Sequence, residues 1–306
     1  GDLLAGGPRV AQTAAMLRRA VAVFGYGGAV ALAADRLSQL GDIDEAVAAV
    51  ACTDPRCALT PALRSEVAEA VRRAGLEERQ HELRIFVSSG LSAMSGGSLA
   101  LGAGVAVGIP RTFLCDSPSH PLLRNLKIRG IPVGVRSGEH EAVALRVREL
   151  LVRSPECRGF AVAHELGHAA REDGLITVAL HSAAVAGATH GLVRGLAAAS
   201  PTRAVVGMLG AAAAAVGGHW LMELRADAFA VSRGYVEGAD QFLRQRRELN
   251  VLLRRQRAEA FEATPMKRIS IFGGILREVD ATFNRRLKPG DFAAVPELLT
   301  HPPISL

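Results

Sequence analysis

Long apolar stretches alternate with charged, amphipathic segments along this chain. Two uncharged runs, 175–193 and 204–222, are joined by a short polar connection that contains Ser200-Pro201. Two such runs in succession predict an apolar helical hairpin over 175–222. Each run is close to the roughly 20 residues that a helix needs to cross a bilayer, but alanine and glycine, which favour insertion less than leucine does, dominate both. A membrane-spanning hairpin and an alanine-rich hairpin packed in a soluble core therefore both stay open.

A third apolar segment, 20–34, stands between charged pairs near the start of the chain. It is short for a membrane span, so a buried or interfacial packing helix is the favoured interpretation and a membrane helix is the alternative. The glycine cluster at 25–28 lacks the Lys-Ser/Thr of a phosphate loop, and we interpret it as a site of close helix packing. Amphipathic helices follow, one of them starting with Thr60 as N-cap and Pro61. Residues 1–83 thus form an N-terminal helical region.

The pattern then changes to short extended segments. Strands are predicted at 84–88 and 131–135, and the proline in the latter makes it an edge strand. The segment 98–107 is a second strand or an extended loop. The window 85–110 carries no charge, but its glycines and serines favour a buried hairpin over a membrane span. Residues 84–306 are accordingly assigned to a second domain, and the fold class is α+β, predominantly helical.

A helix with strong start signals carries the most specific motif of the chain. Ser-Pro-Glu at 154–156 combines an N-cap, a proline suited to the first helical position and an acidic first turn. The helix is expected to end at Gly174. It contains an HExxH motif, in which His164 and His168 share one helix face and can bind one metal ion. Glu165 between them suits a general base that acts on a metal-bound water.

A metal site of this type needs a third protein ligand, and a carboxylate pair after the second apolar run can supply it. Glu223 and Asp227 are four apart, so one can bind the metal while the other accepts a hydrogen bond from a ligating histidine. They follow an apolar run in which unpaired carboxylates are costly, which favours this role over a solvated helix face. His219, one turn earlier on that face, is a rival third ligand.

Composition narrows the function classes. The 306 residues are 49% hydrophobic but only 4% aromatic, and the net charge is +6. One Trp and two Tyr are too few for the stacking platforms that bind single-stranded nucleic acid, so no nucleic-acid partner is expected. An arginine-rich helix expected at 239–263 has two interpretations: a solvated helix face, which we favour, and a contact with anionic lipid headgroups.

Cysteine usage leaves one pairing open. The chain has four cysteines and no CxxC motif, which is not the pattern of a disulfide framework. Free thiols are expected, and the alternative is a bond between Cys52 and Cys57 across the short turn that separates them.

These motifs, in this order, resemble the gluzincin membrane metallopeptidases of the HtpX and CAAX prenyl endopeptidase kind. The stretch 154–168 resembles the family's zinc helix with its approach, and Glu-Leu-Arg-Ala-Asp at 223–227 resembles its Glu-x-x-Ala-Asp. Thr-His-Pro-Pro at 300–303 resembles a His-Pro element after the last helix. Ser-Ala-Met-Ser-Gly-Gly at 92–97 stands where the family has an edge-strand motif. The resemblance covers about 84–306, and the apolar hairpin lies where HtpX-like members have membrane spans.

The resemblance implies a zincin-type catalytic core with a small sheet and one zinc ion. His164, His168 and Glu223 would bind the zinc. Glu165 would be the catalytic base, and Asp227 would orient a ligating histidine. The expected function is a zinc-dependent endopeptidase, membrane-associated and active in protein processing or quality control. The alternative is a catalytically weak, metal-binding membrane scaffold or quality-control factor.

The resemblance also implies a polypeptide substrate that binds as an extended strand. Ser92, Ala93, Leu99 and Leu101 are the residues expected to bind it. His301 is expected to hydrogen-bond the oxyanion. Two departures weaken the match: Ser92 replaces the family's usual asparagine, and the chain ends before the arginine that normally follows the His-Pro element.

Overall fold

The protein is mostly helical, with a small three-stranded sheet and a separate two-stranded one, as the predicted α+β class requires. The computed structural model describes residues 8–54, 56–124, 126–128, 131–132, 140–198 and 200–262. The helices are α1 (Pro8–Gly41), α2 (Ile43–Val50), α3 (Pro61–Ala74), α4 (Pro121–Arg124), α5 (His140–Leu151), α6 (Pro155–Ala170), α7 (Asp173–Ala197), α8 (Pro201–Ser232) and α9 (Val236–Glu262). The strands are β1 (Leu83–Ser88), β2 (Met94–Ser98), β3 (Gly104–Pro110), β4 (Lys127–Ile128) and β5 (Ile131–Pro132).

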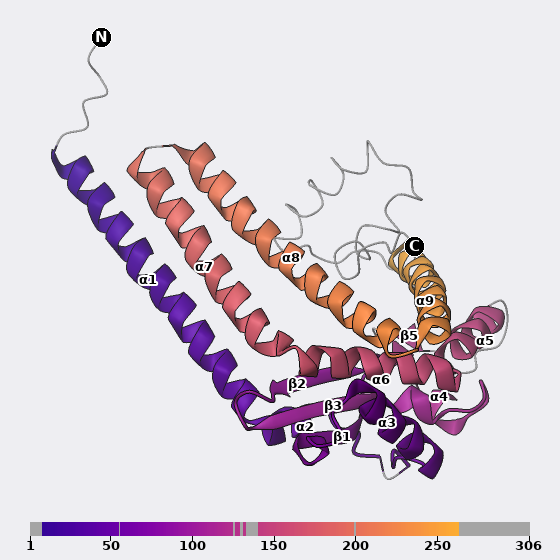
Figure 1. Ribbon diagram of the computed structural model, residues 1–306. Coiled ribbons are helices and arrows are strands. Elements are labelled where there is room, and N and C mark those ends of the chain that lie inside the picture. The colour runs from indigo at the N-terminus through magenta and orange to yellow at the C-terminus, as the bar shows by residue number, and fades with distance from the viewer. Residues whose placement is uncertain are drawn as a thin grey trace.

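Three long helices, α1, α7 and α8, run side by side away from the rest of the molecule, with α7 in the middle (Figure 1). We call them the arm, and the remaining helices with the sheets the base. Each arm helix contains a segment long and apolar enough to cross a membrane: Ala15–Ser38, Asp173–Ala197 and Thr202–Ser232. Large apolar side chains lie exposed along them, Phe24 at 79% and Leu209 at 65%. The arm therefore suits a bilayer, and the soluble-core interpretation of the hairpin does not fit.

The segment 20–34 differs from the favoured expectation. It is the middle of the much longer α1 rather than a short buried helix, because the charged residues on either side continue the helix instead of ending it. It packs against α7 at one point of close approach, where a Cβ on Gly25 would overlap the side chain of Thr189. Gly27 and Gly28 meet no such neighbour, so the packing role of the glycine cluster is confined to Gly25.

Small residues form the interface between α7 and α8. A Cβ on Gly191 would lie 2.8 Å from the Cα of Gly207, and one on Gly195 would lie 2.6 Å from the Cβ of Ala204. One turn away, Gly187 faces Ala211. Such seams of small residues let helix backbones approach closely where lipid supplies no hydrophobic force between helices.

The three-stranded sheet has β3 at its centre, parallel to β1 and antiparallel to β2. All seven residues of β3 are buried, which agrees with a buried hairpin in the uncharged window rather than a span. The strand interpretation of 98–107 is wrong in its first half, because a turn with Gly102 at φ 70° precedes β3. The strand predicted at 131–135 is only β5 within the described residues, and it pairs with β4.

The base has one core that draws on both the N-terminal segment and the later chain. Leu63 and Val67 of α3 pack with Val107 of β3 and Leu166 of α6. The start signal of α3 is confirmed: the Thr60 hydroxyl accepts a hydrogen bond from the backbone N–H of Leu63, with N···O 3.2 Å. In α9, the described Arg244 and Arg247 side chains are exposed, in keeping with a solvated face.

Two local expectations are corrected. The cysteines Cys52 and Cys57 form a disulfide, because the turn between them brings their Cα atoms to 6.2 Å, within bonding range. The helix with the HExxH motif ends at Ala170 rather than at Gly174. Glu172 adopts a left-handed conformation with φ 56°, which breaks the helix, and Gly174 lies in the first turn of α7.

Candidate metal centre

Helix α6 carries two histidines towards the lower end of α8. Ser154 starts α6 as predicted, since its hydroxyl accepts a hydrogen bond from the Cys157 N–H at N···O 3.3 Å. In Figure 1, α6 lies across the base of α7 and α8. Two small residues let α6 and α8 touch: a Cβ on Gly167 would lie 3.3 Å from the Cα of Ala226 and 3.0 Å from Phe229. This close contact brings the face of α8 that bears Glu223 within reach of α6.

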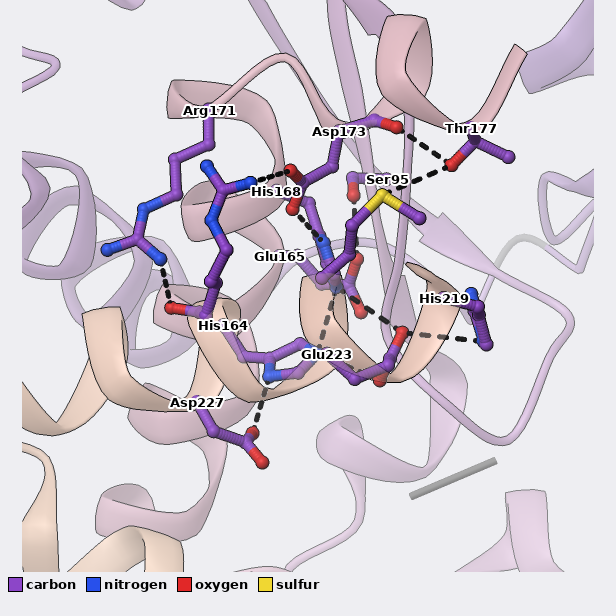
Figure 2. Close-up of polar contacts among 12 residues, drawn as sticks. Ser95, His164, Glu165, His168, Arg171, Asp173, Thr177, His219, Glu223 and Asp227 are labelled. Atoms are coloured by element: carbon purple, nitrogen blue, oxygen red, sulfur yellow. Dashed lines mark hydrogen bonds and ion pairs between the residues drawn. The ribbon is translucent and has the colours of Figure 1, made fainter. Parts of the chain in front are cut away.

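Three potential metal ligands meet where the helices touch (Figure 2). The Nε2 atoms of His164 and His168 are 3.1 Å apart. Each lies 3.6 Å from a carboxylate oxygen of Glu223. One ligand atom from each residue lies within 4.8 Å of the others, so the three residues could hold a metal ion.

Each histidine has a carboxylate partner on its other ring nitrogen. His164 Nδ1 lies 2.7 Å from Asp227 Oδ1, and His168 Nδ1 lies 2.8 Å from Asp173 Oδ2. These pairs fix the ring orientation and leave both Nε2 atoms facing the same point, as in carboxylate–histidine–metal triads. Asp173 is buried, and its second oxygen lies 3.7 Å from Arg225 Nη1.

The electrostatics of the centre favour positive charge. Burial lowers the pKa of His164, but hydrogen bonds with the carboxylates of Asp227 and Glu223 outweigh burial and raise that pKa to about 10. Nitrogen and oxygen donors of this kind, oriented by second carboxylates, match the ligand chemistry of a divalent transition metal.

Sequence reasoning missed Asp173. Asp173 follows His168 by five residues. The sequence predicts that the helix continues through this segment, and on a continuous helix residues five apart do not share a face. The left-handed Glu172 turns the chain back towards the histidine. The end of β2 and the turn after it hold Glu172 in place, because its carboxylate accepts hydrogen bonds from the Ser98 hydroxyl and from the Ala100 N–H.

Glu165 lies beside the edge strand β2. The Ser95 hydroxyl donates a hydrogen bond to Glu165 Oε2 with an O···O distance of 2.7 Å. Ser95 belongs to the 92–97 motif, but its sequence position alone does not indicate this contact, since the register of β2 places it against α6. This contact holds the Glu165 carboxylate at the border of the metal centre.

A small pocket of about 30 Å³ opens beside Glu165. Its walls come from the approach to β2, α6, α8 and α9. The lining residues are Ser92, Ala93, Phe160, Ala161, His164, Glu165, Asp227, Phe242, Leu243 and Arg246. The expected substrate residues Ser92 and Ala93 are thus next to the centre.

The other expected substrate residues are placed elsewhere or are not described. Leu99 is buried in the core, and Leu101 is exposed in the turn before β3. The strand expected near them cannot accept a substrate, because β3 is paired on both sides. His301 lies outside the described residues. His219, the rival ligand, has its Nε2 3.9 Å from Glu223 Oε1 and stands apart from the group of three.

No protein-family model, curated protein or solved structure matches the chain. Its function is therefore inferred from the geometry of its own residues.

Proposed function

We propose that the protein is a zinc-dependent endopeptidase that works at a membrane surface. The observation that carries this proposal is the meeting of His164, His168 and Glu223 with Glu165 beside them at an open pocket. Two imidazoles and one carboxylate are one of the ligand sets of catalytic zinc sites, which keep a further position open for water or substrate. A bound zinc ion would act as a Lewis acid and lower the pKa of water at the centre.

Glu165 is the proposed proton carrier. It takes a proton from the attacking water as the water oxygen bonds to the carbonyl carbon, and it delivers that proton to the amide nitrogen as the C–N bond breaks. The products are a carboxylate and an amine. The Ser95 hydroxyl orients the Glu165 carboxylate through its hydrogen bond.

The edge strand and the pocket support a polypeptide substrate. Within the described sheet, β2 pairs with β3 on one side only, and its Ser95 touches Glu165. An extended chain that adds to the outer side of β2 would pass the catalytic base. Because Glu165 protonates the leaving amine, the pocket beside it suits the side chain that follows the cleaved bond. Phe160 and Phe242 favour a small apolar side chain there.

The spacing of charged residues along α7 and α8 indicates where the metal centre would lie relative to a bilayer. On α7, twenty residues separate Asp173 from Arg194, and on α8, nineteen separate Arg203 from Glu223. At 1.5 Å per residue, both stretches are about as long as the roughly 30 Å hydrocarbon layer is thick. Arg194 and Arg203 then lie at the far surface, and the metal centre lies at the near one. Polypeptides with segments close to the membrane are the proposed substrates.

The test compares Glu165→Gln with Glu156→Gln, an identical change at an exposed position on the same helix. Purified protein in liposomes is given zinc and a membrane-anchored substrate with an unstructured segment next to its anchor. Glu165→Gln should keep about one zinc ion per chain and lose cleavage by roughly 10²–10⁴-fold. Glu156→Gln should cleave like the original protein.

Two outcomes contradict the proposal. Unchanged cleavage by Glu165→Gln would remove Glu165 from the mechanism. Bound zinc without turnover by the original protein would instead support the metal-binding scaffold, the alternative to which the Ser92 departure points.

A further inference from the structure

His219 is an unusual residue for its place in the arm. It is the one titratable residue between Ala204 and Met222 in α8. A polar ring in a membrane helix is costly and marks a functional position by default. It precedes Glu223 by four residues, so it lies about 6 Å from Glu223 along the helix axis, close to the near surface.

Its ring stands next to the metal centre rather than inside it. The Nε2 atom lies 3.9 Å from Glu223 Oε1, longer than a hydrogen bond, and the side chain is 49% exposed. Figure 2 shows His219 on the side of Glu223 away from Asp227. Another histidine of the hairpin, His190, is engaged differently, with its Nδ1 3.2 Å from the Tyr26 hydroxyl.

We propose that His219 is a catalytic residue that donates its ring N–H to the carbonyl oxygen of the bond being cleaved, an inference that rests on the proposed peptidase function. When the water oxygen bonds to the carbonyl carbon, the π electron pair moves onto the carbonyl oxygen. It returns when the C–N bond breaks. A hydrogen bond to that oxygen is strongest while it carries the negative charge, so it lowers the barrier. His219 donates without giving up its proton, because Glu165 carries the proton that is transferred.

The placement of His219 favours this role over that of a fourth ligand. A fourth protein ligand would close the position that a catalytic zinc site keeps open. The ring is half exposed and separate from the group of three, so a substrate at the centre can reach it. This donor is on α8 and is independent of His301, to which the family resemblance assigns a similar role.

The test uses His219→Ala, His219→Gln and the control His181→Ala, an exposed histidine on α7. Removing one such donor lowers kcat by about 10²–10³-fold. We expect that loss in His219→Ala with KM and zinc content unchanged. The glutamine side chain also carries an N–H donor, so His219→Gln should recover part of kcat. His181→Ala should match the original protein.

A second readout does not depend on turnover. A phosphinic peptide carries a tetrahedral phosphinate in place of the scissile amide, and calorimetry gives its Kd. His219→Ala should weaken its binding by about the same factor as kcat/KM, because both report the same hydrogen bond. The Kd of His181→Ala should be unchanged.

The outcomes separate this inference from the proposed function. Loss of zinc in His219→Ala would make His219 a ligand and overturn the inference. Unchanged kcat and phosphinic-peptide affinity in His219→Ala would also overturn it while leaving the peptidase function intact. If the zinc-bound original protein shows no turnover, the proposed function fails. The catalytic role of His219 then fails with it, whereas unchanged kcat and Kd in His219→Ala beside an active original protein refute the role of His219 alone.

Discussion

The arm and the base hold their helices together in different ways. In the arm, several close contacts between α7 and α8 join glycines and alanines, such as Gly191 with Gly207, while large apolar side chains point outwards. In the base, the large side chains are inside, and Leu166 and Val107 are fully buried. The same alanine-, valine- and leucine-rich composition is therefore sorted in opposite directions in the two regions.

The difference follows from the solvent that each region suits. In water, burying apolar area drives packing, so the largest side chains fill the core. In lipid, the surroundings are as apolar as leucine, and helices associate through close contacts of small residues. Helix α8 of the arm also reaches the base: its upper part forms the glycine seam, and Ala226 in its lower part contacts Gly167 of α6. The candidate metal centre lies at the junction of the arm and the base.

The largest difference between the arm and the base is expected from truncating one leucine in each region. Leu166→Ala in the base should lower the free energy of unfolding by about 2–5 kcal/mol, because it leaves a cavity in a closed core. Leu209→Ala in the arm should change it by less than about 0.5 kcal/mol, because that side chain is exposed. Unfolding in detergent by denaturant measures both. Equal losses would show that the arm is packed like the base.

A smaller effect is expected from enlarging a glycine of the seam. Gly191→Leu must separate α7 from α8 and should cost about 1–3 kcal/mol. Gly210→Leu is the matched control, because a side chain at Gly210 meets no atom within 4 Å. Thermal unfolding midpoints in detergent compare the two variants. A control as unstable as Gly191→Leu would argue against a specific seam.

The smallest effect is confined to the metal centre. Asp173→Ala removes the carboxylate that orients His168, and loss of such a partner typically weakens metal binding by about 10–100-fold. Asp240→Ala removes an exposed carboxylate from α9 and should leave zinc affinity unchanged. Competition with a zinc chelator gives both dissociation constants. Unaltered affinity in Asp173→Ala would mean that His168 keeps its orientation without Asp173.

Helical periodicity was enough to group the candidate ligands. Residues four apart on a helix share a face whatever the fold, so His164 with His168, and Glu223 with Asp227, could be paired from spacing alone. The structure places them together at one centre. The lengths of the apolar runs likewise predicted the hairpin, although its glycine seam depends on which faces of α7 and α8 meet.

The residues that were missed or misplaced depend on breaks in regular structure. Asp173 reaches His168 only because Glu172 is left-handed, which no spacing rule indicates. Leu99 and Leu101 were assigned to a strand that begins five residues after Leu99, at Gly104. Ser95 meets Glu165 through the packing of a strand on a helix far away in the chain. Contacts of this kind are set by tertiary structure.

The continuity of α8 has a mechanical consequence. The helix runs unbroken from Pro201 to Ser232, so the rod that suits the membrane also holds Glu223. The histidines are on α6, which is anchored in the core of the base. If the arm spans a bilayer, a change in bilayer thickness would be met by helix tilt, and a tilt of α8 would shift Glu223 against His164 and His168. The spacing of the three candidate ligands would then depend on lipid chain length.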